Sequence, residues 1–392
     1  MPAADPLKAR IRQALADRHS QGLLRHRQPV QRQEGAMIKV DGRLYHHFCG
    51  NDYLGLAECD SIRIAWQDGL RRFGAGSGAS PLVTGHHQAH HELEQQLCDW
   101  LGFESALLFS SGFAANQAVI HALMQKGDLL LQDRLNHASL QEAGHLSPAT
   151  LKRFAHNDSA DLARRLEAAP RGCPKLVVTE GVFSMDGDQA PLAEMRQLCD
   201  DHGAWLMVDD AHGCGVLGPQ GRGSCAADQI QPDILVVTFG KAFGCSGAAV
   251  LCRGDLAQYL TQFARHLVYS TALPPAQACA LTEAVRQIQN QQWRRERLHT
   301  LSNLLTANLG TQVPLMSTAT AIKPLMVGES QRALDLSAQL KERGFWISAI
   351  RPPTVPAGQA RLRLTLSAEH SEQQILALAD ALNEVWHAAE TE

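Results

Sequence analysis

The chain has 392 residues, of which 45% are hydrophobic and 19% charged, and its formal net charge at pH 7 is −4. This length suggests two domains, and the composition is too apolar for intrinsic disorder. Because lysine and arginine are scattered along the sequence, binding to nucleic acid or to an anionic membrane surface is disfavoured. No apolar stretch resembles a signal peptide or approaches the ~20 residues of a membrane-spanning helix. We therefore expect a cytoplasmic protein with no nucleic-acid or membrane partner.

Neither the cysteines nor the histidines predict a metal site. The ten cysteines include no Cys-x-x-Cys pair, so we expect packing residues and not a zinc or disulfide framework. His86 and His90 share a helical face beside His87 and His91, but no set of carboxylates or cysteines stands beside them at ligand spacing. We interpret these histidines as surface or substrate-loop residues and expect no metal.

The predicted elements alternate along most of the chain. A helix carrying Leu7, Ile11 and Leu15 lies within residues 1–35, and turn-forming residues follow at 50–55. The glycine-rich segment 74–78 has no strand before it, so it indicates a flexible loop and not a dinucleotide site. Between about 88 and 285, short apolar runs alternate with helical patterns, which is typical of βαβ units in a mostly parallel sheet. The predicted strands are 106–109, 129–131, 176–179, 205–208, 234–239 and 248–251.

After residue 286 the pattern becomes that of a small α+β domain. A polar helix is predicted over 287–309, followed by strands at 321–327, 345–350 and 361–366. The last strand alternates with period two, which puts its polar side chains on one face. Ser371 and Gln374 form the capping box of a final helix. We expect an N-terminal helix and arm (1–50), a large domain (51–285) and a small domain (286–392).

Polar residues follow several of the predicted strands at the edge where a parallel sheet binds ligands. Asp209 ends one strand, Lys241 follows another, and Ser110-Ser111-Gly112 opens a helix after a third. An aspartate or a lysine in such a place is commonly a helix cap or a solvated side chain. Their joint placement at neighbouring strand ends makes a binding site for a charged organic cofactor the better interpretation.

Pyridoxal 5′-phosphate fits this set of residues. Lys241 can form a Schiff base with its aldehyde, and a carboxylate such as Asp209 keeps a pyridine nitrogen protonated. His212 follows three residues later and can reach the phenolic oxygen of the cofactor. The amides of Gly112 and Phe113, at a helix N-terminus, suit the phosphate, and the Thr238 hydroxyl can add a further contact.

The motifs together resemble the α-oxoamine synthases, a family of pyridoxal-phosphate enzymes. The likeness covers essentially the whole chain and implies an α/β, aspartate-aminotransferase-like fold with a mostly parallel central sheet and a smaller α+β C-terminal domain. One departure from the family lies at residues 79–82, so the resemblance assigns no contacts to that loop. The matching motifs are Asn51-Asp-Tyr-Leu-Gly55, Ser111-Gly-Phe-Ala-Ala-Asn116, Asn136-His-Ala-Ser139, residues 179–187, Val208-Asp-Asp-Ala-His-Gly213 and Thr238-Phe-Gly-Lys241.

The resemblance implies a role for each matching position. Lys241 would bind the cofactor covalently, Asp209 would pair with the ring nitrogen, and His137 would stack on the ring. Arg363, helped by Asn51, would hold the carboxylate of the amino-acid substrate. Ser184 and His212 would contact the oxygen of the ring, and Gly112, Phe113 and Thr238 would bind the cofactor. Ser270 or Thr271 from a partner subunit would reach its phosphate. Arg25 and Thr354 would contact the substrate.

Within the family, residues 154–158, 263–266, 351–358 and 361–365 resemble the members that condense L-alanine with a pimeloyl thioester. The resemblance implies an acyltransferase that forms a homodimer with shared active sites. It leaves open whether coenzyme A or an acyl-carrier protein delivers the acyl group. The alternative within the family is a relative that uses glycine, such as 2-amino-3-oxobutyrate CoA ligase, because it would share every cofactor residue. A catalytically silent binding subunit is disfavoured because Lys241, Asp209 and His212 are all present.

Overall fold

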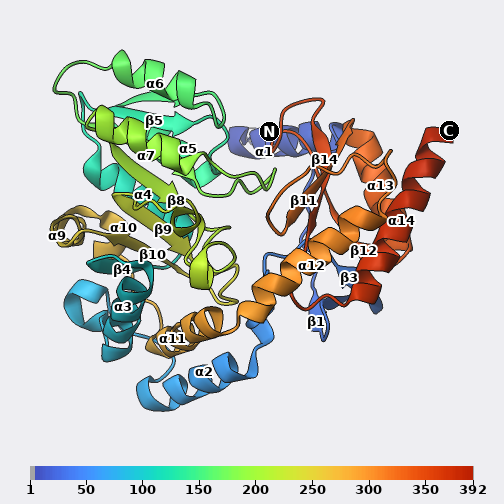
Figure 1. Ribbon diagram of the computed structural model, residues 1–392, viewed down its shortest axis with the longest axis horizontal. Helices are drawn as coiled ribbons and strands as arrows, with labels where there is room; N and C mark the ends of the chain where they lie inside the picture. The colour runs from blue at the N-terminus through green and yellow to red at the C-terminus, as the bar shows by residue number, and fades with distance from the viewer. Residues whose placement is uncertain (1–4, 392) are drawn as a thin grey trace.

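The computed structural model describes residues 5–391, without the side chains of 389–391, and is built around a seven-stranded sheet (Figure 1). Its strand order is β4-β10-β9-β8-β7-β5-β6. The five strands from β9 to β6 run parallel, whereas β10 is antiparallel to both of its neighbours. The predicted, mostly parallel sheet is confirmed. The strands are β4 (Ser105–Phe109), β5 (Leu129–Asp133), β6 (Thr150–Phe154), β7 (Lys175–Glu180), β8 (Trp205–Asp209), β9 (Ile234–Thr238) and β10 (Ala248–Cys252).

Both faces of this sheet are covered by helices, which explains why its strands are apolar without interruption. Within β7, Val177 packs into one hydrophobic cluster, while Leu176 and Val178 pack into another on the opposite face. The sequence after β4 forms α4, so the helix begins directly beyond the carboxyl end of a strand. The helices of this part are α2 (Asp60–Phe73), α3 (Gln88–Leu101), α4 (Gly112–Leu123), α5 (Ala138–Leu146), α6 (Ser159–Glu167), α7 (Leu192–Asp201), α8 (Ser224–Ala227), α9 (Gly254–Phe263), α10 (Arg265–Val268) and α11 (Pro275–Asn290).

The C-terminal part contains a three-stranded antiparallel sheet of order β11-β14-β13. The predicted helix 287–309 begins too early. Residues 287–290 belong to the end of α11, Gln291 interrupts the helix, and α12 begins at Gln292. The predicted strand 345–350 is divided between two sheets, since β12 pairs with β3 and β13 pairs with β14. The elements are α12 (Gln292–Asn308), β11 (Ile322–Gly328), α13 (Ser330–Glu342), β12 (Phe345–Trp346), β13 (Ser348–Ile350), β14 (Ala360–Thr365) and α14 (Glu372–Thr391). The capping box before α14 is present, with Ser371 and Gln374 bonded reciprocally.

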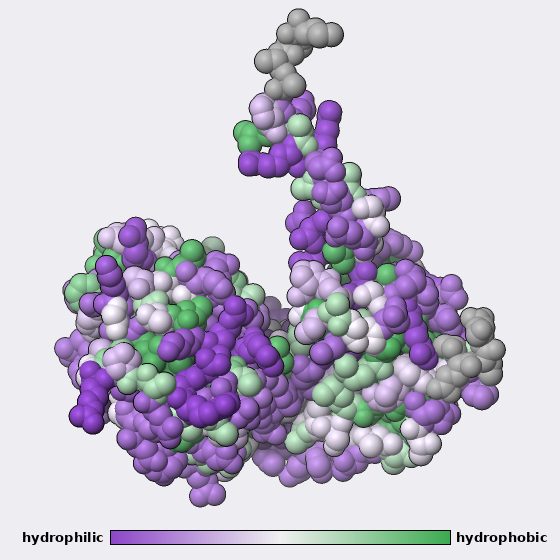
Figure 2. Space-filling model, turned by 90° about the horizontal axis from the view of Figure 1, so that it is seen from above, coloured by the Kyte–Doolittle hydropathy of each residue, from purple (hydrophilic) through white to green (hydrophobic). Residues whose placement is uncertain are grey.

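The N-terminal arm consists of α1 (Pro6–Ser20) followed by β1 (Gln31–Gln33), β2 (Met37–Val40) and β3 (Arg43–His47). Every residue of α1 is exposed, and Figure 2 shows this segment standing out from the body with a largely hydrophilic surface. Basic side chains outnumber acidic ones in this segment. Lysine and arginine are therefore not spread evenly along the chain, contrary to the expectation from the sequence. The charged residues from 5 to 27 are Lys8, Arg10, Arg12, Arg18, Arg25 and Arg27 against Asp5 and Asp17.

No helix within residues 5–391 is long and apolar enough to cross a membrane. All ten cysteines are free, and Cys199, Cys214, Cys225 and Cys252 are buried, as expected for packing residues. The division into an arm and two domains stays a prediction, and the first four residues of the arm lie outside the described part of the chain.

Candidate active site

Two cavities meet at Lys241. The outer cavity, of about 690 Å³, lies between the sheet and the C-terminal part and reaches Arg25, Thr354 and Arg363. The inner cavity, of about 310 Å³, lies over the start of α4 and reaches Asp209 and Thr238. Residues lining both cavities therefore occupy the boundary between them. These shared residues are Asn51, His137, His212 and Lys241.

The sheet brings the polar strand ends together, as parallel strands require. Glu180 ends β7 and Asp209 ends β8, and the two residues are direct neighbours in the register of the sheet. Lys241 follows β9, the next strand over. Both carboxylates lie in the electrostatic surroundings of the lysine. The juxtaposition of an aspartate and a lysine that the sequence predicted is thus present.

A chain of hydrogen bonds holds Asp209 in place. Its Oδ2 accepts from Asn116 Nδ2 at 2.7 Å, and its Oδ1 accepts from the Ala211 amide at 3.1 Å. Asn116 Nδ2 also donates to Ser139 Oγ at 2.9 Å, and Ser139 Oγ lies 2.8 Å from His137 Nδ1. The carboxylate and the imidazole on the wall of the inner cavity are therefore oriented by one network.

Glu180 is a second acid at the site. It had no predicted role in the sequence analysis, although it belongs to the motif formed by residues 179–187. It is 3% exposed, and its Oε1 has no hydrogen-bond partner. Burial, followed by the neighbouring Asp209 charge, raises the pKa of Glu180 well above its usual value. Two adjacent carboxylates rarely both ionise in a dry site. Burial and the neighbouring acid therefore disfavour the ionised form of Glu180.

Lys241 has the electrostatics of a reactive amine. Burial lowers its pKa, while the Asp209 and Glu180 carboxyl groups act in the opposite direction. A lysine whose charged form loses hydration is a better nucleophile and a better proton acceptor near neutral pH. Partial burial also lowers the pKa of His137, and the Lys241 charge adds to that effect.

Asp210 organises the turn that carries Asp209 and His212. Its carboxylate is fully enclosed and accepts from the Ser224 amide at 2.8 Å and from Ser224 Oγ at 2.5 Å. Burial raises its pKa to about 7. The glycines around it leave no space for a side chain, since a Cβ on Gly181 or Gly213 would overlap the carboxylate. The sequence motifs contain glycine at these positions because the acid is packed against their backbone.

The inner cavity fits pyridoxal phosphate. Thr238 Oγ1 and Asn116 Oδ1 are buried polar atoms without partners, and both residues line the cavity. Gly112 begins α4, and a Cβ there would overlap the Thr238 methyl group, so only glycine lets the helix start so close to β9. A helix N-terminus with free amides and a nearby hydroxyl is a suitable site for a phosphate. Phe113 also lines this cavity and is exposed to it.

Arg363 projects from β14 into the outer cavity. Its Nε donates to the Ser184 carbonyl at 2.5 Å, and its Nη2 lies 3.4 Å from Asn51 Oδ1. It is 7% exposed, so an anion in the cavity would meet a guanidinium that is already oriented. Arg361, two residues earlier, is ion-paired with Asp186 and is not free to bind a ligand in the same way. Sequence reasoning did not predict that pair.

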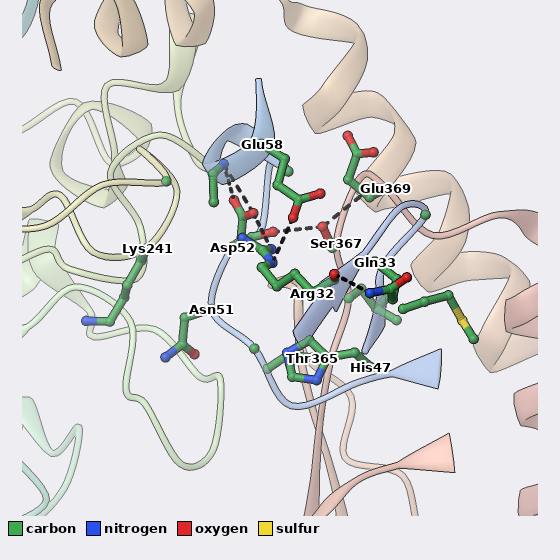
Figure 3. A pocket seen from close by; sticks show the side chains of 18 of the residues that line it. Arg32, Gln33, His47, Asn51, Asp52, Glu58, Lys241, Thr365, Ser367 and Glu369 are labelled. Carbon is green, nitrogen blue, oxygen red and sulfur yellow. Dashed lines mark hydrogen bonds and ion pairs between the residues drawn. The ribbon is translucent and has the colours of Figure 1, made fainter. Parts of the chain in front are cut away.

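The segment that carries Asn51 is clamped between the N-terminal arm and the C-terminal part. Arg32 of β1 pairs with Asp52 at 2.8 Å and approaches Glu58 at 3.7 Å. Ser367 Oγ donates to the Asp52 carbonyl at 2.7 Å. Figure 3 shows these contacts around a third cavity, of about 330 Å³, with the side chains of Asn51 and Lys241 at one side of it.

The structure does not bring Thr271 to either cavity of its own chain. It lies in the exposed segment between α10 and α11, after Tyr269, whose side chain is 77% exposed. The histidines near residue 86 are also away from both cavities. His86 pairs with Glu94 at 2.9 Å, a carboxylate that the sequence interpretation overlooked, and His90 is buried against the Leu273 carbonyl. Within residues 5–391 no cluster of three metal-ligating side chains is found.

Comparison with known proteins gives one consistent result. Residues 46–382 match the family model described as aminotransferase class I and II. An 8-amino-7-oxononanoate synthase of Photobacterium profundum is 58% identical over 385 residues, covering 96% of each chain. The protein of the same name from Vibrio cholerae is also 58% identical, over 379 residues, covering 96% of this chain and 97% of that one.

Two solved structures are similar over most of the chain. A serine palmitoyltransferase variant from S. paucimobilis with a bound PLP–myriocin aldimine has a TM-score of 0.93 at 30% identity and covers 99% of this chain. The whole of that chain is covered in turn. An 8-amino-7-oxononanoate synthase from Francisella tularensis has a TM-score of 0.75 at 29% identity, covering 88% of this chain and 98% of that one.

Proposed function

Because the chain belongs to the class I and II aminotransferase family and, within it, to the 8-amino-7-oxononanoate synthases, we propose that its two connected cavities divide one acyl transfer between them. The enzyme condenses L-alanine with a pimeloyl thioester and releases carbon dioxide and the thiol carrier. The product, 8-amino-7-oxononanoate, is an intermediate of biotin biosynthesis. The observation that supports this division is the row of shared residues at the boundary, with Lys241 among them.

The enzyme depends on pyridoxal 5′-phosphate. When bound, the cofactor would supply an electron-withdrawing ring that stabilises the electron pair left on the α-carbon when a proton or carbon dioxide departs. We assign the inner cavity to it. In this assignment Lys241 would bind its aldehyde, Asp209 would face the pyridine nitrogen, His137 would lie against the ring, His212 would face the ring oxygen, and Gly112, Phe113 and Thr238 would bind the phosphate. Ser184 lines only the outer cavity and would approach the ring oxygen from that side.

Lys241 acts twice in this proposal. Its amine holds the cofactor until the amino acid takes its place, and the freed Nζ then accepts the proton from the α-carbon of alanine. A lysine with an ordinary pKa would be protonated and unable to act as a base near neutral pH. The lowered pKa of Lys241 favours the free amine that this role requires. The same group returns a proton to that carbon before product leaves.

Arg363 orients the amino acid in the outer cavity. Its guanidinium, held by the Ser184 carbonyl and Asn51, offers its remaining N–H groups to the alanine carboxylate. The remaining volume of the outer cavity accommodates the acyl chain, with Arg25 and Thr354 along its wall. The reacting carbon is thereby placed at the boundary with the inner cavity, within reach of Lys241.

A panel of amino acids and thioesters tests this assignment. We expect L-alanine with a pimeloyl thioester to give the highest kcat/KM, and a preference for glycine with a short acyl thioester would instead identify the glycine-using relative. Arg363→Ala, measured in the same panel, should raise the KM for alanine about tenfold to a hundredfold through loss of a charge-assisted contact, while the thioester KM changes by less than threefold. Equal changes in both KM values would contradict the role given to Arg363.

We further propose that an acyl-carrier protein can deliver the thioester through the basic N-terminal arm. The arm stands out from the body (Figure 2), and Arg25, which follows α1 in the chain, lines the outer cavity. A basic segment attracts an acidic carrier more strongly at low salt. Comparing the coenzyme A and carrier-protein thioesters in the panel, at low and high ionic strength, distinguishes the two donors.

We also place the reaction in the cytoplasm, since free cysteines suit a reducing compartment.

We propose that two copies of the chain share their active sites, with Thr271 reaching the phosphate in the partner's inner cavity. The exposed Tyr269, with Leu82 and Val83 on the turn packed beside α10, provides an apolar surface for that contact. Mixing an inactive Lys241→Ala chain with an inactive Thr271→Glu chain should restore activity, because one site of the hybrid dimer then has both native residues. A mixture that stays inactive although hybrids form would show that each chain completes its own site.

A further inference from the structure

Tyr53 lies behind the boundary between the two cavities. Its side chain is 1% exposed and lines neither of them. The hydroxyl lies 2.6 Å from His212 Nδ1 and 3.3 Å from Asn51 Oδ1, and the nearby Arg363 charge acts to lower the pKa of this hydroxyl. Tyr53 can therefore influence bound molecules only through these three neighbours.

The positions of the protons in this cluster follow from its burial. Burial raises the pKa of Tyr53 to about 12, so the hydroxyl keeps its proton. Burial, together with the Lys241 and Arg363 charges, lowers the pKa of His212 well below its usual value, so the ring is neutral and carries one proton. A guanidinium has donors only, so Arg363 can offer an N–H group to the phenol oxygen but cannot accept the phenol proton.

The phenol proton has two possible acceptors. His212 Nδ1 is nearer, at 2.6 Å, whereas Asn51 Oδ1 is at 3.3 Å and also faces Arg363 Nη2. A short contact is the stronger hydrogen bond, so the proton points to Nδ1. The proton of the imidazole itself is then on Nε2, which has no protein partner among the described residues and belongs to a side chain lining both cavities.

We propose that Tyr53 is a positioning residue that holds His212 as an Nε2–H donor toward the cofactor and links it to Arg363. This inference rests on the proposed assignment of the inner cavity to the cofactor and of Arg363 to the substrate carboxylate. A carboxylate that binds Arg363 competes with the phenol oxygen for its N–H groups. Arrival of the amino acid thereby changes the hydrogen bonds of Tyr53 and, through them, the donor strength of His212.

Hydrogen bonds to the backbone of residues 52–54 fix the position of the Tyr53 side chain. The Tyr53 carbonyl accepts from the Ala368 amide at 2.8 Å, and the adjacent Asp52 carbonyl accepts from Ser367 Oγ. Arg294 Nη1 donates to the Leu54 carbonyl at 2.5 Å. Residues beyond β14 and on α12 thus hold the segment against the sheet, as Figure 3 shows for the Ser367 contact.

Tyr53→Phe in the holoenzyme tests the proposal, because phenylalanine keeps the ring and removes only the hydroxyl. The absorbance of the Lys241-bound cofactor is recorded against pH, and L-alanine is titrated by the absorbance change it causes. We expect the pKa of the bound chromophore to shift by about half a unit to one unit, and the alanine Kd to rise about threefold to tenfold. The thioester KM should stay within twofold. Unchanged spectra and alanine affinity in the folded variant would overturn the proposal.

Two further variants separate positioning from general destabilisation. Tyr259→Phe removes a hydroxyl that donates to the Ala122 carbonyl at 2.9 Å, away from both cavities, and should leave the spectra unchanged. In a His212→Gln background, Tyr53→Phe should cause no additional spectral shift, because the ring through which it acts is gone. A full additional shift there would show that Tyr53 acts by another route.

A measurement on the native chain keeps the test independent of the folding of these variants. The sequence has four tyrosines, so 3-fluorotyrosine can replace them all. The more acidic phenol donates more strongly to Nδ1 and should shift the chromophore pKa, and absence of that shift would contradict the proposal. The spectra and the alanine Kd require no acyl donor. Failure of the reaction assignment would appear in the substrate panel, whereas failure of this inference would appear in the spectra.

Discussion

Lys241→Ala should retain the cofactor non-covalently and lose turnover by about 10³-fold or more. The variant removes both the amine that binds the aldehyde and the base that takes the α-proton, and general-base catalysis alone contributes about 10²-fold to 10⁴-fold. Single-turnover kinetics with L-alanine and the thioester measure the loss. Borohydride reduction followed by peptide mapping should label the peptide that contains Lys241 in the native enzyme and no peptide in the variant.

Lys323→Ala is the matched control, since Lys323 is a buried lysine that burial brings to a pKa of about 8. It lies on β11 and donates to the Thr318 carbonyl at 2.6 Å, outside both cavities. We expect its variant to keep the colour of the cofactor and the borohydride label. Undiminished turnover in Lys241→Ala would remove that residue from the mechanism.

Asp209→Ala should lower kcat by about 10²-fold to 10⁴-fold. Removing one partner of a buried charge pair costs about 3 to 5 kcal/mol, and each ~1.4 kcal/mol of barrier is a factor of ten in rate. Here the partner left behind is the protonated pyridine nitrogen, whose pKa falls when the carboxylate is gone. The absorbance spectrum of the bound cofactor against pH and the kcat with saturating substrates report the two effects separately.

The neighbouring acid supplies the contrast for this experiment. Because burial raises the pKa of Glu180, we expect Glu180→Gln to replace one uncharged group by another of nearly the same shape. We expect it to lower kcat less than tenfold and to leave the spectrum close to that of the native enzyme. A loss in Glu180→Gln as large as that in Asp209→Ala would show that Glu180, and not Asp209 alone, carries the charge that the cofactor needs.

Several parts of the fold were predictable because their signals are local. The strand that ends at Asp209 and the strand before Lys241 are unbroken apolar runs, and covering helices on both faces make such runs necessary. The break at Gln291 was not predictable, because polar residues continue on both sides of it. The division of residues 345–350 between two sheets was also not predictable from the sequence, because β12 pairs with β3 of the distant N-terminal arm.

By itself the sequence determined six of the seven strands of the large sheet, all except β6, and the cofactor for which Lys241, Asp209 and the Gly112 turn are suited. These depend on side-chain chemistry and on the rule that parallel strands end at one edge. Only the tertiary structure decided which groups lose water and which meet across the fold. Burial and the adjacent Asp209 raise the pKa of Glu180, and Tyr53 meets His212 although they are separated by 159 positions. Hydration and long-range contact are properties of packing, and no local pattern of residues records them.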